Sequence, residues 1–553
     1  MLRCPFALAL LLSFATVASA RTPPPPSAAA LNAQLAAPLP DDQAAMKAHV
    51  LFLASDAMRG REAGSPEYDI AAQYVAAQFY AAGLKPAGDD GGYLQQVPLV
   101  SYKAASRGSF ALAPARGAAQ PLVFGTDYVP AANPASARTS VSGGVVFVGY
   151  GIDAPQFGQR DYRGVDVRGK IVAVIGGAPK RLGGEERAFF GSPRTKLQAA
   201  AARGAIGLIQ IANPRATPAE LTRMAESYDA ARITWAQGDG TGHAEAPIPG
   251  LGTITPTGAA KLFVGARTPW AQVAAQSAKA APRYRSMPLA GTMTIATDTG
   301  FTPARSSNVV GMIPGGDPQL SREVVVLSAH LDHIGVSKNG EGDRINNGAL
   351  DNAIGIASLI EEARRFKSGG PAPKRSILFL AVTAEEKGLI GSAYFADHST
   401  VPLSAIVADV NLDMPILTYR FEDMIVFGAD RSTLGPIVRR AVAAVGVGLS
   451  PDPMPDEGIF VRSDHFRFVQ KGIPSVFLWP GQKGPGKVAV ESFMANRYHK
   501  PGDDLTQPIL WDQGVRFVDT NYRIAREIAD APDRPVWNKG DYFGTLYKGP
   551  MAR

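Results

Sequence analysis

The sequence predicts an α/β protein whose mainly parallel mixed sheet lies between layers of helices. From about residue 307, short apolar runs of the kind that form buried strands alternate with helical stretches. The chain has 553 residues, of which 46% are hydrophobic, so a large core is expected. At roughly 100–200 residues per domain, this length predicts two to four domains.

The second half of the chain carries the clearest pattern. Buried strands are predicted at 324–328, 377–382, 406–412 and 476–479. Helices are predicted at 352–366, 389–397, 433–445 and 457–470. Alternation of this kind places helices on both faces of a sheet whose strands run mostly in one direction.

The first half is predicted to contain a helix that starts after Ser65. Ser65 is a good N-cap, Pro66 suits the first turn, and Glu67 lies beside the positive end of the helix. Further elements are predicted as strands at 144–149, 170–175 and 208–211 and as a helix at 195–203.

Residues 1–20 are predicted to be a cleavable export signal. Arg3 supplies the positive start, an apolar run extends from 6 to 17, and Ala18-Ser-Ala20 fits the small-residue cleavage rule. The apolar run is shorter than the roughly 17–25 residues that span a bilayer. We therefore expect a periplasmic or secreted protein without a membrane span after cleavage, in which residues 21–40 form a flexible spacer.

Charge and cysteine content exclude several partners and mechanisms. The only cysteine, Cys4, would leave with the signal, so neither a disulfide nor a thiol nucleophile is expected in the mature chain. The formal charge of the whole chain is +7, and its Lys and Arg residues are scattered. Such a pattern favours solubility over a nucleic-acid partner.

Residue types that bind metals follow the predicted strands. The strand at 324–328 leads into His330 and Asp332, whose side chains point to the same side in extended backbone. An imidazole that binds a metal needs its second nitrogen held, usually by a carboxylate or a carbonyl. Taken alone, this pair is more simply interpreted as a histidine at a polar strand end.

Four more signals occur at later segment ends. Asp351 precedes a predicted helix, where an N-cap is the commonest role of aspartate. Glu385 and Glu386 follow a strand, and a divalent cation would stabilise these adjacent carboxylates far more than a helix N-terminus. Asp413 follows the next strand, and His499 lies in a late loop. Because ligands bind at the carboxyl ends of strands in open α/β sheets, the signals together predict a metal centre.

The set is chemically coherent for two zinc ions. Their four positive charges would be balanced by Asp351, Glu386, Asp413 and one hydroxide. Mixed nitrogen and oxygen ligands suit zinc, and two neighbouring zinc ions can lower the pKa of a shared water. A carboxylate that is not a ligand must then take the proton of this water, and Glu385 is the candidate for this role.

At these residues the sequence resembles the di-zinc aminopeptidase family of the bacterial leucyl aminopeptidase and aminopeptidase Y type. The matching motifs are His330-x-Asp332, Asn347-Gly-Ala-x-Asp351-Asn352, Glu385-Glu386, Asp413 and Tyr498-His499. The resemblance implies five zinc ligands, with Asp351 bridging both metals: His330, Asp351, Glu386, Asp413 and His499. It also implies that Asp332 orients His330, that Glu385 is the general base and then acid, and that Tyr498 helps to stabilise the oxyanion.

Two neighbouring motifs are assigned from the same resemblance. The family pattern favours His330 over the alternative ligand His333. Ser463-Asp-His465 is similar to a family motif that we interpret as architectural or substrate-side.

The resemblance covers nearly the whole mature chain. Residues 41–121 and 289–553 resemble the two parts of a zinc-peptidase-like catalytic domain, the second with a C-terminal tail. Residues 122–288 resemble an inserted β-rich protease-associated domain. The implied function is an exported aminopeptidase with two Zn²⁺ ions that acts on peptides with a free N-terminus.

Three alternatives are open at the level of sequence. A carboxypeptidase or dipeptidase of the same fold should need arginines at the carboxylate of its substrate. Glutaminyl cyclases resemble the catalytic domain but work with a single zinc and usually lack the inserted domain. A receptor-like binding protein would have lost its metals, whereas every ligand residue is present in this sequence.

Overall fold

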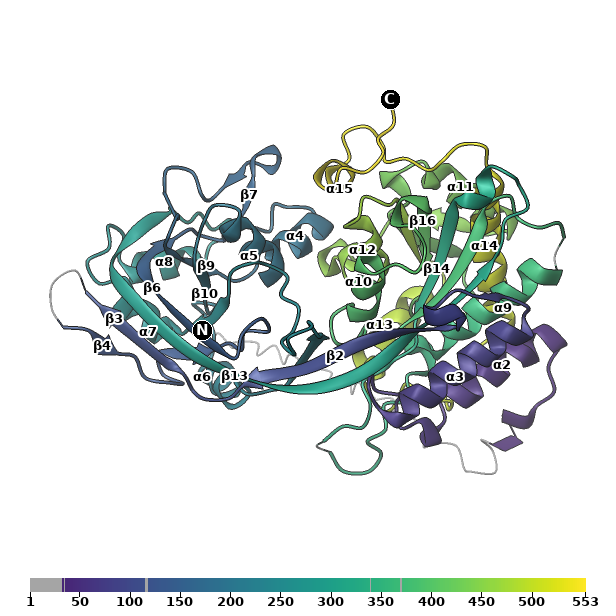
Figure 1. Ribbon diagram of the computed structural model, residues 1–553, viewed down its shortest axis with the longest axis horizontal. Helices are drawn as coiled ribbons and strands as arrows, with labels where there is room; N and C mark the ends of the chain where they lie inside the picture. Colours follow the sequence, from purple (N-terminus) through teal and green to yellow (C-terminus); the bar gives the residue numbers. More distant parts are fainter. Residues whose placement is uncertain (1–31, 34, 115–117, 339, 369) are drawn as a thin grey trace, which may run out of the picture. The chain divides into compact units, whose positions relative to one another are not determined.

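The computed structural model describes residues 32–553 except 34, 115–117, 339 and 369. The predicted export signal and residues 21–31 of the predicted spacer lie outside the described residues. The chain divides into two compact units, Met1–Leu39 and Pro40–Arg553. The second unit holds the sheets and helices labelled in Figure 1. No helix in the described part of the chain is long and apolar enough to cross a membrane.

A mixed sheet centred on β14 forms the core of the second half of the chain. Its parallel strands, in spatial order, are β15 (Ser376–Val382), β14 (Val324–His330), β16 (Ile406–Asn411) and β19 (Ser475–Pro480). Antiparallel strands extend it on either side, namely β13 (Met287–Ile313) next to β15 and β17 (Asp423–Phe427) next to β19. The sheet is therefore mainly parallel, as the sequence predicts.

Helices cover both faces of this sheet (Figure 1). One face carries α2 (Asp41–Leu53), α9 (Ile354–Ser368) and α14 (Trp511–Asp530), and the other carries α10 (Ile390–Asp397) and α12 (His465–Val469). Every residue of β14, β15 and β16 is buried. Burial on both faces explains why these strands are continuous apolar runs in the sequence.

The four strands predicted in the second half are present, and their ends lie within two residues of the predicted ones. The predicted helix at 457–470 is wrong in extent, because only His465–Val469 is α-helical. Two short 3₁₀ turns precede it, Pro455–Glu457 and Ile459–Val461. Between them Gly458 adopts φ +59°, a left-handed conformation that ends one turn before the next begins.

The helix predicted after Ser65 is α3 (Pro66–Ala81). The Ser65 hydroxyl accepts a hydrogen bond of 3.1 Å from the Tyr68 amide, so Ser65 is the N-cap that the sequence predicts. Gly83 follows the helix at φ +74°, as expected for a glycine that ends a helix.

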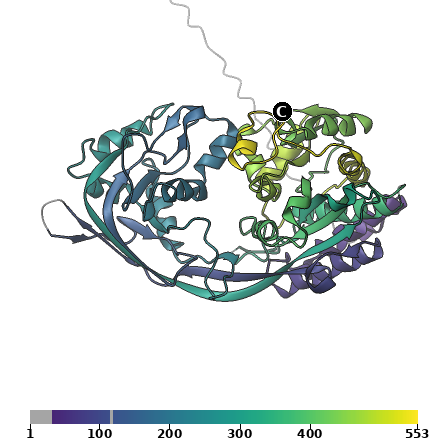
Figure 2. The same ribbon diagram turned by 45° about the horizontal axis from the view of Figure 1, so that its top comes forward.

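Two long strands, β2 (Leu94–Ala104) and β13, run side by side (Figures 1 and 2). The first part of β13 pairs with β6 (Arg138–Phe147), which belongs to a second sheet with the parallel strands β9 (Ile171–Ile175), β10 (Gly207–Ile211) and β12 (Gly250–Ile254). Because β13 takes part in both sheets, hydrogen bonds connect 17 strands of the described residues in one network. The assignment of 122–288 as a protease-associated domain stays a prediction.

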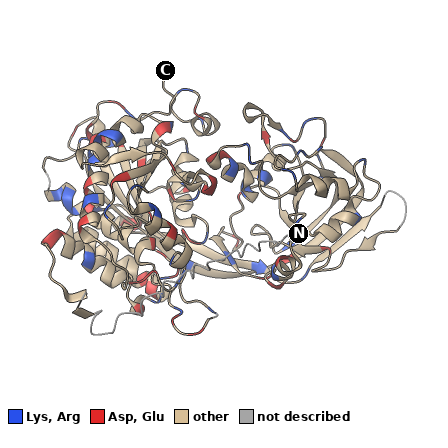
Figure 3. Cartoon of the chain, turned by 180° about the vertical axis from the view of Figure 1, so that it is seen from behind, with Lys and Arg blue, Asp and Glu red and all other residues tan. Residues whose placement is uncertain are grey.

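The remaining helices are α4 (Gly184–Gly191), α5 (Pro193–Ala201), α6 (Pro218–Glu226), α7 (Pro256–Leu262), α8 (Trp270–Gln276), α11 (Leu434–Ala444), α13 (Gly486–Asn496) and α15 (Tyr542–Leu546). The remaining strands are β1 (Lys85–Pro86), β3 (Ser109–Ala113), β4 (Gln120–Pro121), β5 (Tyr128–Pro130), β7 (Asp153–Ala154), β8 (Gln159–Arg160), β11 (Arg232–Trp235) and β18 (Gly448–Ser450). Basic and acidic residues are interspersed along the elements (Figure 3).

Candidate metal centre

The carboxyl ends of β14, β15 and β16 meet at one edge of the sheet. His330 at the end of β14 pairs in register with Val382 at the end of β15, and Ser328 pairs with Asn411 at the end of β16. This register brings together the residues that follow each strand. Side chains separated by up to 169 positions in the sequence, from His330 to His499, therefore contact the same cluster.

His330, Asp351 and Asp413 form a first group of ligand atoms. The Nε2 atom of His330 lies 3.2 Å from Oδ1 of Asp351 and 3.1 Å from Oδ1 of Asp413. The other ring nitrogen, Nδ1, lies 3.1 Å from the main-chain carbonyl oxygen of Asp332. This second contact fixes the ring so that Nε2 faces the two carboxylates.

Asp351, Glu386 and His499 form a second group. The Nε2 atom of His499 lies 3.3 Å from Oδ2 of Asp351 and 3.0 Å from Oε2 of Glu386. Asp351 thus offers one carboxylate oxygen to each group. His333, which the family pattern disfavours as a ligand, also lies here, with Nδ1 at 2.7 Å from Oε1 of Glu386.

The spacing of these atoms fits bound zinc. Ligand atoms at about 2.0–2.1 Å from a tetrahedral zinc ion are about 3.3 Å apart, and the distances in the two groups are 3.0–3.3 Å. Two sets of residues have ligand atoms that all lie within 4.8 Å of one another, namely His330, Asp351 and Asp413, and His333, Asp351 and Glu386. Imidazole and carboxylate ligands are the donor types that zinc binds.

The electrostatics of the cluster favour a cation. Burial lowers the pKa of His330, but Asp413 and Asp351 outweigh burial and raise this pKa well above its usual value. The same balance, with Asp351 and Glu386 as the carboxylates, raises the pKa of His499 to about 10. Without a metal, these carboxylates favour the protonated form of both imidazoles, and a bound metal ion would take the place of the proton.

Glu385 lines the same cavity as His330, Asp351 and Asp413. Burial, reinforced by neighbouring carboxylates such as Glu386, raises the pKa of Glu385 well above its usual value. A carboxylate of raised pKa beside metal ligands has the properties of a general base that later donates the proton.

Asp332 contacts the site in two ways. Its main-chain carbonyl, not its carboxylate, contacts His330. Its carboxylate accepts hydrogen bonds from the amides of Glu385, at 3.0 Å, and Glu386, at 3.3 Å. Burial raises the pKa of Asp332 to about 6. Asp332 therefore holds both the histidine and the backbone of the two glutamates.

Tyr498 lies over His499, with ring centroids 3.9 Å apart and an angle of 26° between the rings. Its ring also lines the cavity. Burial, together with Asp351 and Glu386, raises the pKa of Tyr498 above its usual value, so the phenol keeps its proton. The rest of the lining is mostly apolar and comprises Met414, Ile459, Arg462, Ser463, Phe477, Trp479 and Met494.

Residues 308–525 match the model of a protein family described as Peptidase family M28. We call residues 308–525, which are similar to this family, the M28 domain. The matched range includes all five predicted ligands, Glu385 and Tyr498. The resemblance that the motifs predict is confirmed, as is the α/β fold class.

Curated relatives of the M28 domain include two aminopeptidases. Aminopeptidase YwaD of Bacillus subtilis (strain 168) is 30% identical over 208 residues, which are 37% of this chain and 41% of the relative. A probable leucine aminopeptidase 2 of Aspergillus oryzae is 31% identical over 218 residues, 36% of this chain and 40% of the relative. The chain thus spans about two fifths of the length of these relatives. The solved structure of an aminopeptidase from Aneurinibacillus sp. strain AM-1 covers 89% of this chain and 95% of its own, at 20% identity and a TM-score of 0.47.

Arg61 lies outside the matched M28 residues, but it supports the segment at 347–351 that ends at Asp351. We call this segment the metal loop. Its fully buried guanidinium donates hydrogen bonds to the carbonyl oxygens of Leu331, at 2.8 Å, Asn347, and Gly348, at 2.8 Å. It therefore ties the end of β14 to the segment that carries Asp351. In the sequence, Arg61 is marked only by the run Gly60-Arg61-Glu62, which resembles the family. This run does not indicate that Arg61 supports the loop.

Asp503 and Ser463 are two further supports in the M28 domain. The Asp503 carboxylate accepts hydrogen bonds of 3.0 Å from the amides of Leu350 and Asp351. The Ser463 hydroxyl donates to Oδ2 of Asp413 at 2.5 Å. The sequence does not predict a role for Asp503. The one feature that could have indicated it is the position of an acid four residues after His499.

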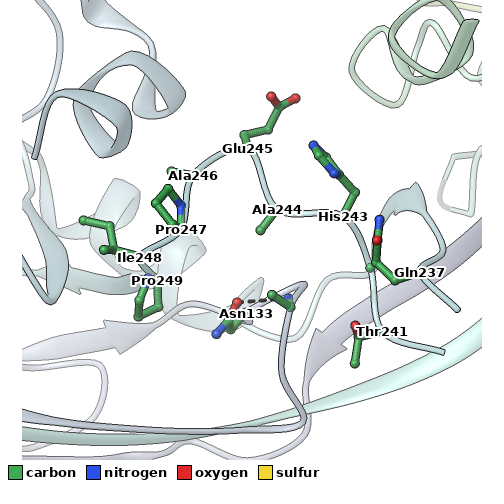
Figure 4. A pocket seen from close by; sticks show the side chains of 12 residues that line it. Asn133, Gln237, Thr241, His243, Ala244, Glu245, Ala246, Pro247, Ile248 and Pro249 are labelled. Atoms are coloured by element: carbon green, nitrogen blue, oxygen red, sulfur yellow. Dashed lines mark hydrogen bonds between the residues drawn. The ribbon is translucent and has the colours of Figure 1, made fainter. Parts of the chain in front are cut away.

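A second pocket, of about 490 Å³, lies along residues 237–249 (Figure 4). His243 and Glu245 project to the same side of this segment. His243 stacks on Trp235 with ring centroids 3.8 Å apart, and Glu245 pairs with Arg194 at 2.7 Å and with Arg467 of α12 at 3.3 Å. His243 and Glu245 are therefore engaged by other residues of the chain. We accordingly assign the chemistry of the M28 domain to the candidate metal centre and not to this pocket.

Proposed function

We propose that the protein is an exported zinc-dependent aminopeptidase that uses two zinc ions and Glu385 as its general base. The observation that carries this proposal is the pair of ligand groups that share Asp351, with ligand atoms 3.0–3.3 Å apart. One group would be His330, Asp351 and Asp413, and the other Asp351, Glu386 and His499. The M28 match and the aminopeptidase relatives support the same activity.

The proposed mechanism assigns each residue one task. Bound zinc would supply Lewis-acid polarisation of the scissile carbonyl and a lowered pKa for water. Glu385 removes a proton from the attacking water and then delivers it to the amine of the leaving peptide. Asp332 fixes the backbone of Glu385, and the Tyr498 hydroxyl donates a hydrogen bond to the developing oxyanion.

The lining of the cavity favours an aminopeptidase over a carboxypeptidase. A carboxypeptidase site must bind the carboxylate of its substrate with positive groups. In the described lining the one basic group besides the ligand histidines is Arg462, and it pairs with Glu457 at 3.2 Å. The carboxylates of the cavity instead suit a substrate ammonium group. The apolar side chains Met414, Phe477 and Trp479 suit an apolar N-terminal residue.

The export of the protein and its domain plan belong to the same proposal. The residues at 1–20 have the composition of a cleavable signal, so the substrates would be periplasmic or extracellular peptides. Residues 122–288 would be the inserted protease-associated domain, which the parallel strands β6, β9, β10 and β12 support.

The experiment is a substrate panel with metal analysis. Aminoacyl anilides and the matching N-blocked peptides are incubated with the purified protein, with and without a chelator. We expect hydrolysis only of substrates with a free N-terminus, loss of activity with the chelator and about two zinc ions per chain. Cleavage of N-blocked peptides, or a protein that binds no zinc and cannot be loaded, would overturn the proposal.

A further inference from the structure

His333 is a buried histidine that the proposed mechanism does not use. It follows Asp332 directly, and its side chain is 0% exposed. Among the described residues, neither its Nδ1 nor its Nε2 has a hydrogen-bond partner, and the same holds for Oε1 of Glu386. Buried polar atoms in folded proteins nearly always have a hydrogen-bond partner, so the lack of one at these atoms needs an explanation, such as a bound ion.

The contact between His333 and Glu386 is a close ion-pair contact. Nδ1 of His333 lies 2.7 Å from Oε1 of Glu386, which is short enough for a hydrogen bond. The two atoms are in contact without a well-aligned hydrogen bond between them. This geometry fits two ligand atoms that face a common cation, and Asp351 completes a group of three potential ligands.

The surroundings of His333 place it at the second ligand group. Its ring lies 5.8 Å from the ring of His499, at an angle of 68°. Its Nδ1 or Nε2, an oxygen of Asp351 and an oxygen of Glu386 all lie within 4.8 Å of one another. The two histidines thus approach the same two carboxylates from different directions.

The fold makes space for this imidazole. Gly348 has φ +61°, and a Cβ atom at this position would lie 2.7 Å from Cγ and Cδ2 of the His333 ring. Only glycine fits both the backbone conformation and the ring. The amide of His333 donates to the carbonyl of Arg61 at 3.3 Å. Because the side chain of Arg61 supports the metal loop, this bond also fixes the backbone of His333 relative to that loop.

We propose that His333 is a further ligand of the metal position formed by Asp351, Glu386 and His499. The inference rests on the proposed two-metal function and makes the two positions unequal. One position has a single imidazole, from His330, and the other has two, from His333 and His499. Imidazole ligands favour zinc and cobalt over magnesium and manganese. The position with two imidazoles is therefore expected to bind zinc more tightly than the position with one.

The test is a titration of the metal-free protein with Co²⁺, whose visible absorption reports the ligands, and with Zn²⁺. Wild type is expected to bind two ions in separate steps. H333A and H333Q are expected to weaken the tighter step by at least the roughly 10–100-fold that substitutions around a metal site cost. Loss of a nitrogen ligand is expected to change the Co²⁺ absorption of that step and to leave the other step unchanged.

H398A is the matched control, because His398 is an exposed histidine that stacks on Tyr394. It should bind both ions as wild type does. Thermal unfolding of the metal-free proteins shows whether each variant is folded, and H333Q keeps a polar side chain of similar length if H333A does not fold.

Three results would separate the possible failures. Unchanged affinity and absorption in folded H333A and H333Q would overturn the proposal. So would weaker binding with an unchanged Co²⁺ spectrum, which would mean that His333 only orients Glu386. A wild-type protein that binds no metal would instead overturn the proposed function itself.

Discussion

Charged groups are buried in two regions of this protein, and each region neutralises them differently. In the segment at 122–288, Lys196 is 1% exposed, and its Nζ donates to the main-chain carbonyls of Tyr150 and Gly177. In the same region Asp161 accepts hydrogen bonds from the amides of Tyr150 and Ile152, at 3.1 and 3.0 Å. Here main-chain groups form hydrogen bonds directly with both buried side chains.

At the metal centre the carboxylates of Asp351, Glu386 and Asp413 face imidazoles across a cavity. Like charges this close are stable only beside positive charge. A buried ionisable group that bonds to the backbone therefore has a structural role, whereas carboxylates that converge on a cavity are arranged for a cation.

The largest effect is expected for E385Q. The variant keeps the shape of the side chain but cannot accept the proton of the attacking water. Turnover should therefore fall by roughly 10²–10⁴, the usual contribution of a positioned acid–base group. The measurements are kcat on an aminoacyl anilide and zinc content, which should stay that of wild type. Loss of zinc in E385Q would mean that Glu385 is a ligand.

D351N should impair both metal positions, because each ligand group takes one oxygen of Asp351. An amide is a weaker ligand than a carboxylate, so both affinities should fall by at least about 10–100-fold. Zinc content after dialysis against a weak chelator measures this loss. Unchanged zinc, or the loss of one ion alone, would contradict the shared role of Asp351.

K196M removes the buried amino group of the segment at 122–288, which bonds to the backbone. Burial lowers the pKa of Lys196 to about 7, whereas the unfolded chain has a lysine pKa of about 10.4. Between these values the unfolded state binds the additional proton, so the free energy of unfolding of wild type should rise with pH.

Urea unfolding at pH 7.5 and 9.5 measures this dependence. Lys196 should contribute a rise of about 2–3 kcal/mol over this interval, at about 1.4 kcal/mol per pH unit and proton. The rise should be absent in K196M, while zinc content stays unchanged. Equal pH dependence in both proteins would show that the buried lysine keeps its proton.

The smallest effect is expected for T217A. Thr217 caps α6 in a capping box, in which its hydroxyl accepts from the Glu220 amide and the Glu220 carboxylate accepts from the Thr217 amide. Removal of such a cap costs about 0.5–2 kcal/mol. Urea unfolding should detect the loss, and S227A, at the other end of α6, is the control. A change in zinc content in T217A would contradict the separation of the two regions.

Much of the site could be predicted because each ligand follows an element with a strong local pattern. His330 ends one apolar run, and Glu386 and Asp413 follow two others. Such short runs are typical of buried strands, and parallel strands end at one edge. The helix predicted at 457–470 was wrong because Gly458 allows a left-handed turn that apolar periodicity does not register.

Other features depend on contacts between distant segments. Arg61 reaches carbonyls some 270–290 residues away, and Asp503 holds the amides beside Asp351 from 152 residues away. Local residue patterns do not encode such contacts, because they arise only when strands and loops are packed.

The amino-acid sequence was enough to predict the α/β class, the order of the strands in the second half and a set of candidate zinc ligands. These follow from hydrophobic periodicity and side-chain chemistry, which act over short distances along the chain. The tertiary structure alone decided which oxygen faces which imidazole, that Asp332 contacts His330 through its carbonyl, and that His333 lies against Glu386. Such choices depend on distances of a few ångströms between segments far apart in the chain, and only packing sets those distances.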